Sequence, residues 1–136
     1  MRVNRKIKRH LLLALLLTVL SASPALAGWL KMASNEVSVF YLESPTPKKV
    51  GTHVMIRVLR DHTSAQFAGA GAYLSSIDEI EVDCERQRIR RLYSSDHPQH
   101  MGEGKFVNSE HGPMSWNAVV PGTIVQRIVD IACLQG

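Results

Sequence analysis

Alternation of apolar and polar side chains with a period of two dominates the chain from Trp29 onward. The clearest example is the stretch from Thr52 to Asp61, where Val54, Ile56 and Val58 share one face. Because successive side chains of a β-strand point to opposite faces of its sheet, this pattern predicts a half-buried strand. We expect the face with Val54, Ile56 and Val58 to lie in the core. The opposite face, which we expect to lie outside the core, carries His53, Met55, Arg57 and Leu59.

A second long strand is predicted from Ala72 to Glu85, with an interruption around Ser75 and Ser76. Its second half alternates strictly, with Ile80, Val82 and Cys84 facing inward and Glu79, Glu81, Asp83 and Glu85 facing water. Such alternation is typical of an antiparallel sheet with one wet face. The turn at 85–87 leads into a strand over 88–95, whose basic residues would lie opposite those acids and favour one register by charge pairing.

Shorter segments complete the predicted sheet. Two strands are expected over 29–34 and 36–43, with a turn at Asn35 between them. Pro45 and Pro47 follow, and proline cannot donate to a strand ladder. The small residues of 66–71 predict a flexible connection, 105–109 a last short strand, and 112–121 an extended connection that carries Trp116.

The period changes near the end of the chain, where apolar residues recur at helical spacing: Ile124, Val125, Ile128, Val129, Ala132 and Cys133. Thr123 and Gln126 form a capping-box pattern directly after Pro121-Gly122, which ends the preceding extended segment. Together these elements predict an α+β fold, an antiparallel sheet of about five or six strands with a C-terminal helix packed on one face.

The first 27 residues have a different character. Five basic residues and no acid precede the uncharged segment Leu11 to Leu20, and Ala25-Leu26-Ala27 has the small-x-small pattern of a signal peptidase site. We therefore expect a signal peptide over 1–27, cleavage between Ala27 and Gly28, and one domain over 28–136. The alternative, a membrane anchor, is disfavoured because ten apolar residues rise only about 15 Å as a helix, roughly half the hydrocarbon thickness of a bilayer.

Removal of this segment changes the charge of the protein. The full chain has 16 basic and 12 acidic residues, and loss of the five leader charges leaves 11 against 12. A nucleic-acid partner, which requires a basic footprint, is therefore not expected. The predicted destination of the exported protein is the periplasm or the outer cell surface.

Cys84 and Cys133 are the two cysteines of the chain. In an oxidising compartment they most simply pair with each other and link the helix to the sheet. Free buried thiols and redox or metal chemistry are the alternatives. No cysteine stands near the predicted cleavage point, so lipid attachment there is not expected.

Three histidines, His97, His100 and His111, lie in a polar loop with acids nearby, namely Asp96, Glu103 and Glu110. Histidine is a common metal ligand, but this spacing matches no zinc pattern, and a solvated loop is the favoured interpretation. No G-x-S-x-G elbow presents a nucleophile. We therefore predict a protein that is not an enzyme and has no cofactor and no metal site.

The densest basic patch of the exported chain consists of Arg86, Arg88, Arg90 and Arg91. Such a patch could engage an acidic or sulfated partner. The competing interpretation is a neutralised face, in which these arginines pair with the acidic strand before them. The second interpretation is favoured.

From Ser75 onward the sequence resembles the surface-adhesin protein E family of exported bacterial proteins. The resemblance rests on several marks in order: Asp83-Cys84 at the end of the acidic strand, the strand Ile89 to Ser94, Met101-Gly102-x-Gly104, Trp116, Val120-Pro121-Gly122 and Ala132-Cys133. It implies an antiparallel sheet with a C-terminal helix, joined cysteines and no catalytic role. The founding member is a surface lipoprotein that binds host matrix proteins such as vitronectin and laminin, whereas this chain lacks the lipid-bearing cysteine.

The leading hypothesis is therefore an exported, non-enzymatic binding module whose partner is an extracellular matrix or envelope protein. A periplasmic accessory protein of unknown ligand is the first alternative, and a metal site in the loop from His97 to His111 is the second. An exposed sheet edge would also suit a dimer.

Overall fold

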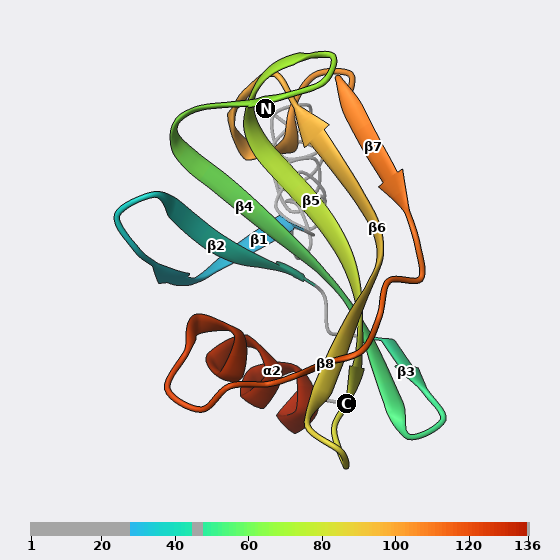
Figure 1. The fold of residues 1–136 in the computed structure, drawn as a ribbon. Helices are drawn as coiled ribbons and strands as arrows, with labels where there is room; N and C mark the ends of the chain where they lie inside the picture. Colours follow the sequence, from blue (N-terminus) through green and yellow to red (C-terminus); the bar gives the residue numbers. More distant parts are fainter. Residues whose placement is uncertain (1–27, 45–47, 136) are drawn as a thin grey trace, which may run out of the picture.

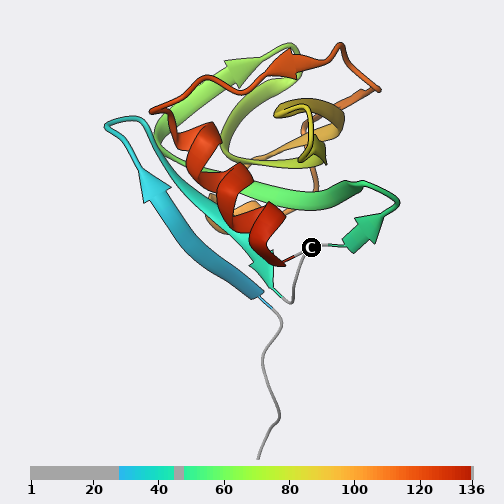
Figure 2. The same cartoon turned by 90° about the horizontal axis from the view of Figure 1, so that it is seen from below.

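The computed structural model describes residues 28–44 and 48–135. One antiparallel sheet contains all eight strands in the order β1-β2-β4-β5-β6-β7, with β3 paired to β4 and β8 paired to β6. Figures 1 and 2 show the helix α2 lying across one face of this sheet. The strands are β1 (Gly28–Ser34), β2 (Ser38–Ser44), β3 (Lys48–Val50), β4 (His53–Ala68), β5 (Gly71–Asp83), β6 (Arg88–His97), β7 (Asn108–His111) and β8 (Asn117–Ala118), and the helices are η1 (His100–Gly102) and α2 (Ile124–Gln135).

The predicted fold class is confirmed, with more strands than expected. β3 has three residues and β8 has two, which is too short for alternation to be visible in the sequence. The strand predicted at 105–109 begins three residues later than expected. It is β7, in which Asn108 to His111 pair with β6. The leader, its cleavage point and the Pro45–Pro47 break lie outside the described residues.

The core lies between α2 and one face of the sheet, as predicted. Val54, Ile56 and Val58 of β4 belong to the same buried cluster as Ile128 and Val129 of α2. Burial of each such side chain contributes roughly 1.5–3 kcal/mol, and this packing compensates for the marginal intrinsic stability of a helix of 12 residues.

Leu59 was predicted to lie outside the core, and this prediction is wrong. The side chain is fully buried, on the sheet face opposite α2. There η1 covers it, and the backbone of Gly102 approaches Leu59 and Ile77 closely. A second, smaller apolar contact therefore exists on the face that the sequence pattern assigns to water.

The segment 66–71 is not a flexible connection but the end of a long hairpin. β4 continues to Ala68, Phe67 pairs with Ala72, and the ladder closes at Gly71. Ser75 and Ser76 do not interrupt β5 either, since both are buried within the strand. The Ser75 hydroxyl donates to the Gln99 carbonyl and accepts from the Gly102 N–H, which attaches η1 to the sheet.

The helix begins with half of the predicted capping box. Thr123 Oγ1 accepts a hydrogen bond from the Gln126 N–H at 3.2 Å. The Gln126 side chain does not return to the cap and instead donates to Asp130 Oδ1 at 2.6 Å. Val125, placed by its spacing on the apolar face, is 38% exposed. No helix among the described residues has the length and apolar character needed to cross a membrane.

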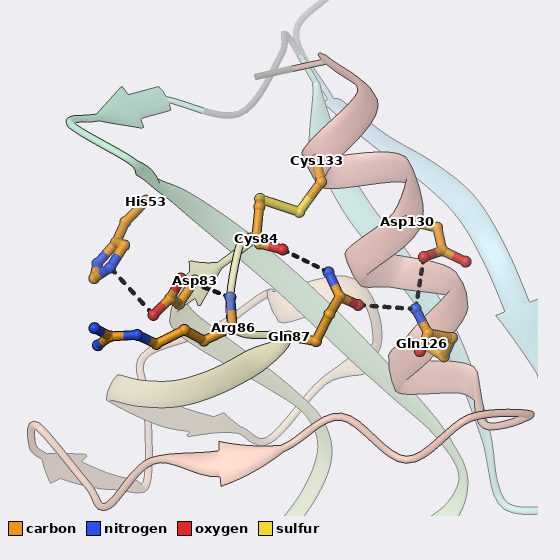
Figure 3. Close-up of a disulfide and its surroundings, with 8 residues drawn as sticks. All are labelled: His53, Asp83, Cys84, Arg86, Gln87, Gln126, Asp130 and Cys133. Atoms are coloured by element: carbon orange, nitrogen blue, oxygen red, sulfur yellow. Dashed lines mark hydrogen bonds and ion pairs between the residues drawn. A yellow bond between two sulfur atoms is a disulfide. The ribbon is translucent and has the colours of Figure 1, made fainter.

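The disulfide between Cys84 and Cys133 is present, with 5.9 Å between the two Cα atoms (Figure 3). It joins the residue after β5 to the last turns of α2. Beside it, Gln87 Nε2 donates to the Cys84 carbonyl at 2.8 Å, and Gln126 Nε2 lies 3.4 Å from Gln87 Oε1. The contact between helix and sheet at this end is thus both covalent and polar.

Candidate binding surfaces

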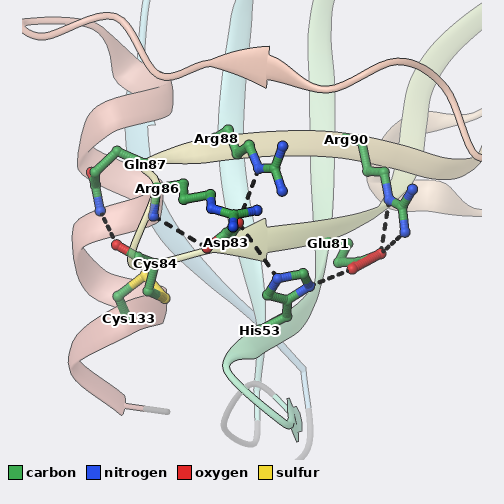
Figure 4. Close-up of polar contacts among 9 residues, drawn as sticks. All are labelled: His53, Glu81, Asp83, Cys84, Arg86, Gln87, Arg88, Arg90 and Cys133. Atoms are coloured by element: carbon green, nitrogen blue, oxygen red, sulfur yellow. Dashed lines mark hydrogen bonds and ion pairs between the residues drawn. A yellow bond between two sulfur atoms is a disulfide. The ribbon is translucent and has the colours of Figure 1, made fainter.

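The predicted alignment of basic and acidic residues on β5 and β6 is confirmed by the register. Asp83 lies opposite Arg88 and Glu81 opposite Arg90, and His53 of β4 lies opposite Asp83 from the other side. Figure 4 shows these side chains meeting on the sheet face that α2 does not cover. We call this group, together with Trp116, the Trp116 cluster: His53, Glu81, Asp83, Arg88, Arg90 and Trp116.

Each carboxylate of the Trp116 cluster is contacted by a basic side chain from each of its two neighbouring strands. Arg90 donates from Nε and Nη2 to Glu81 Oε1, at 2.9 and 2.8 Å, and His53 Nδ1 lies 2.6 Å from Glu81 Oε2. Arg88 Nε donates to Asp83 Oδ2 at 2.9 Å, and His53 Nε2 lies 3.5 Å from the same oxygen. His53 therefore bridges the two acids.

These contacts bury Asp83 and partly bury Glu81, although the sequence pattern predicted that both would face water. Asp83 is 2% exposed because Arg88 and His53 cover it. Burial alone would raise the pKa of each carboxyl, but hydrogen bonds and charge attraction outweigh it. The net result is a lowered pKa for Glu81, held by His53 and Arg90, and for Asp83, held by Arg88, the Arg86 N–H and His53.

Trp116 packs on this charged layer. The guanidinium carbons of Arg88 and Arg90 each lie 4.4 Å from its ring centre, and the His53 ring meets it edge-on at 5.6 Å. Guanidinium groups near an aromatic face are attracted by its quadrupole, with about 0.5–1 kcal/mol for each contact at partly exposed sites. The long connection between β7 and α2 is thereby attached to the sheet face opposite the helix.

The four arginines of the predicted patch do not share one surface. Arg88 and Arg90 belong to the Trp116 cluster and are paired with acids, in agreement with the neutralised-face interpretation. A register shift between Glu79 and Ile80 places Arg91 opposite Ile80, so it faces the α2 side, 3.7 Å from Asp78. Arg86 lies in the turn between β5 and β6. A ligand role for the patch stays a prediction.

The three loop histidines have separate partners. His97 lies between Ser95 Oγ and the Gly104 carbonyl, His100 lies 3.0 Å from Asp61, and His111 packs on the Tyr93 ring. Within residues 28–44 and 48–135, no three histidine, cysteine or acidic side chains form a group that could hold a metal ion.

A buried polar chain that the sequence did not indicate runs through His62. Its Nδ1 lies 2.9 Å from Ser38 Oγ and its Nε2 lies 3.2 Å from Ser76 Oγ, and Ser76 donates to Asp96 Oδ1 at 2.7 Å. Because Ser76 uses its proton on Asp96, it must accept from His62 Nε2–H, so Nδ1 accepts from the Ser38 hydroxyl. Burial, with a contribution from Arg60, lowers the pKa of His62, which keeps the ring neutral.

This order of hydroxyl, imidazole and carboxylate does not form a working nucleophile. Ser38 is buried, and the N–H groups of Val37 and Ser38 both donate to Asn35 Oδ1. They are therefore engaged in capping the β1–β2 turn and are not free to stabilise an oxyanion. The chain of hydrogen bonds is best explained as a buried link between β2, β4, β5 and β6. Its residues are far apart in sequence, so only the sheet register reveals it.

Comparison with known proteins agrees with this architecture. The sequence model of a family described as surface-adhesin protein E matches residues 29–134. The chain belongs to this family. The match covers the sheet, the Trp116 cluster, both cysteines and nearly all of α2, so the family placement extends well beyond the segment from Ser75 onward that carries the sequence resemblance.

Solved structures of Haemophilus influenzae protein E share the fold of this family member. Crystal form II of Haemophilus influenzae protein E superposes on this chain with a TM-score of 0.63 at 11% identity, and the superposition covers 82% of this chain and 91% of the protein E chain. Protein E from non-typeable Haemophilus influenzae gives a TM-score of 0.60 at 12% identity, with 82% and 79% covered. At this identity the likeness establishes the fold alone. No curated protein sequence matches the chain.

Proposed function

We propose that this protein is an exported, non-enzymatic adhesive module that binds a matrix or envelope protein outside the cytoplasm. The observation that carries the proposal is the match of the surface-adhesin protein E family over residues 29–134. The disulfide between Cys84 and Cys133 supports export, because such bonds persist in oxidising compartments.

The first test addresses export. Protein isolated from the native host is expected to begin at Gly28 and to contain the oxidised cysteine pair, as measured by intact mass spectrometry. A retained leader with two reduced thiols would contradict the proposal. Protease treatment of whole cells then locates the protein: digestion in intact cells supports surface display, and protection until the outer layer is opened contradicts adhesion to a matrix protein and leaves an envelope protein as the partner.

The second test addresses binding. Purified protein is applied to immobilised host matrix proteins and, side by side, to envelope extract. Saturable retention by either supports the proposal and identifies the class of partner. As a control, the variant Cys84→Ser with Cys133→Ser is applied under the same conditions, because retention that depends on the fold should weaken when the helix is released. Equal retention of both forms, or none, would contradict specific adhesion.

A further inference from the structure

A cavity of about 120 Å³ lies between α2 and the sheet face that it covers. Its wall is almost entirely apolar and comes from four strands and the helix: Phe40, Ile56, Val58, Ile80, Ile89, Val125, Ile128 and Val129. Apolar cavities of about 150 Å³ in other proteins bind molecules the size of benzene. The volume therefore suits an aromatic ring or a short acyl chain.

Two charged side chains, Arg60 and Asp78, complete the wall. Asp78 is 5% exposed and is fully engaged: Arg60 donates to it from Nε at 2.8 Å and from Nη2 at 3.3 Å, and Ser94 Oγ donates at 2.7 Å. One end of the cavity is thus polar, whereas the remainder is not. Ligand pockets commonly combine an apolar wall with a few convergent polar groups.

A second cation stands at the same carboxylate. Arg91 Nη1 lies 3.7 Å from Asp78 Oδ1, and Arg91 Nε is buried with no hydrogen-bond partner among the described residues. Two guanidinium groups therefore face one carboxylate, which leaves one positive charge uncompensated in this group. A buried donor without an acceptor costs about 1–3 kcal/mol, so an added acceptor at this point would be stabilised.

We propose that this cavity binds a small monocarboxylate whose apolar body is no larger than a single aromatic ring or a short acyl chain. The body occupies the cavity and the carboxylate lies at Arg60, which lines it, while Arg91 adds positive charge from behind Asp78, 3.7 Å from its Oδ1. Guanidinium groups match carboxylates in charge and geometry, which favours an anion over a neutral or cationic ligand of the same shape. This site is on the α2 side of the sheet and is independent of adhesion to a protein partner.

The test is a titration of the purified protein with benzoate, followed by NMR of the methyl groups. Shifts are expected at Val125, Ile128 and Val129, which line the cavity. Benzyl alcohol should bind more weakly, and benzylamine should leave these methyl groups unshifted. Shifts confined to other parts of the protein, or equal binding of all three compounds, would overturn the proposal.

Two variants test separately how the apolar body and the carboxylate of the ligand contribute to binding. Val125→Phe places a larger side chain at the partly exposed rim of the cavity and should abolish the benzoate shifts. Arg91→Gln should weaken benzoate about tenfold and leave benzyl alcohol unchanged, as a charge-assisted contact of about 1.4 kcal/mol would require. Arg86→Gln carries the same charge change away from the cavity and should not alter benzoate affinity. Full benzoate affinity in Val125→Phe, or equal effects of the two arginine variants, would refute the site.

Discussion

The guanidinium of Arg90 joins Trp116 to Glu81: its carbon lies 4.4 Å from the ring centre of Trp116, while its Nε and Nη2 donate to Glu81. One side chain of β6 thus connects β5 with the long segment that leads to α2. The attraction to the ring and the charged hydrogen bonds act on the same group, so they are lost together when that group is removed.

Arg90→Ala should lower the free energy of unfolding by about 2 kcal/mol, because it removes both donors from Oε1 of the partly buried Glu81 carboxylate and leaves only the His53 contact at Oε2. Urea unfolding followed by circular dichroism measures the change. Arg86→Ala is the matched control in the adjoining turn and should cost about 0.5 kcal/mol or less. An equal effect of both variants would show that the Trp116 cluster does not stabilise the fold.

Reduction of the disulfide should lower the free energy of unfolding by about 4 kcal/mol, since the bond closes a loop between residues 49 positions apart. The double variant Cys84→Ala with Cys133→Ala should show a similar loss, measured by urea unfolding. A reducing agent should destabilise the native protein and leave this double variant unchanged. If the native protein kept its full stability after verified reduction, the attachment of α2 by the bond would contribute nothing.

His62 should make the protein less stable as the pH falls below about 6.5, its ordinary pKa. Burial and Arg60 lower its pKa in the folded state, opposed by Asp61, Asp78 and Asp96. The unfolded chain therefore takes up the proton first, and stability is lost as the pH falls toward the folded-state pKa, by at most about 1.4 kcal/mol per pH unit.

The measurement for His62 is urea unfolding between pH 8 and pH 5. His62→Gln should show a smaller loss over this interval than the native protein. His111→Gln, which removes an exposed histidine outside this chain of hydrogen bonds, is the matched control. If the His62 variant lost as much stability between pH 8 and pH 5 as the native protein, the pH dependence could not be attributed to His62 in its buried chain with Ser38, Ser76 and Asp96.

Gly102→Ala should destabilise the protein by about 3 kcal/mol. The backbone at Gly102 has φ of +71°, and an added Cβ would lie 2.7 Å from Ile77 Cδ1. The left-handed conformation and the close contact each contribute to the cost. Gly51 has a similar φ of +63° with open space around it, so Gly51→Ala measures the conformational part of the destabilisation alone, at about 1 kcal/mol. Thermal or urea unfolding of both variants tests whether η1 is packed as tightly as the structure shows.

The sequence predicted the strands and the helix whose apolar or charged residues recur at regular spacing. The alternation at Val54, Ile56 and Val58 identified the core face of β4, and the helical spacing around Ile128 identified α2. The acids of β5 and the arginines of β6 also predicted their own register, because charge pairs lie directly opposite each other in an antiparallel hairpin.

Features that depend on contacts between distant segments were not predicted. Leu59 obeys the alternation but is covered by η1, whose position depends on Ser75 and Gly102. Asp83 was expected to face water, and its burial follows from His53, which lies 30 positions earlier on a neighbouring strand. The stacking of Trp116 on two arginines likewise needs the path of the β7 to α2 connection, which alternation does not determine.

The bond between Cys84 and Cys133 also decides how a pulling force would travel through the molecule. Tension applied between Gly28 and Leu134 passes from the end of β5 directly to Cys133 through the two sulfur atoms. Everything between those cysteines, including β6, β7, β8 and most of α2, lies outside the path of the load and cannot be stretched while the bond is intact. The ladders formed by β1 to β5, and the pairing of β5 with β6, would have to resist shear, and the maximum extension of the chain would be shortened by the length of the bypassed segment.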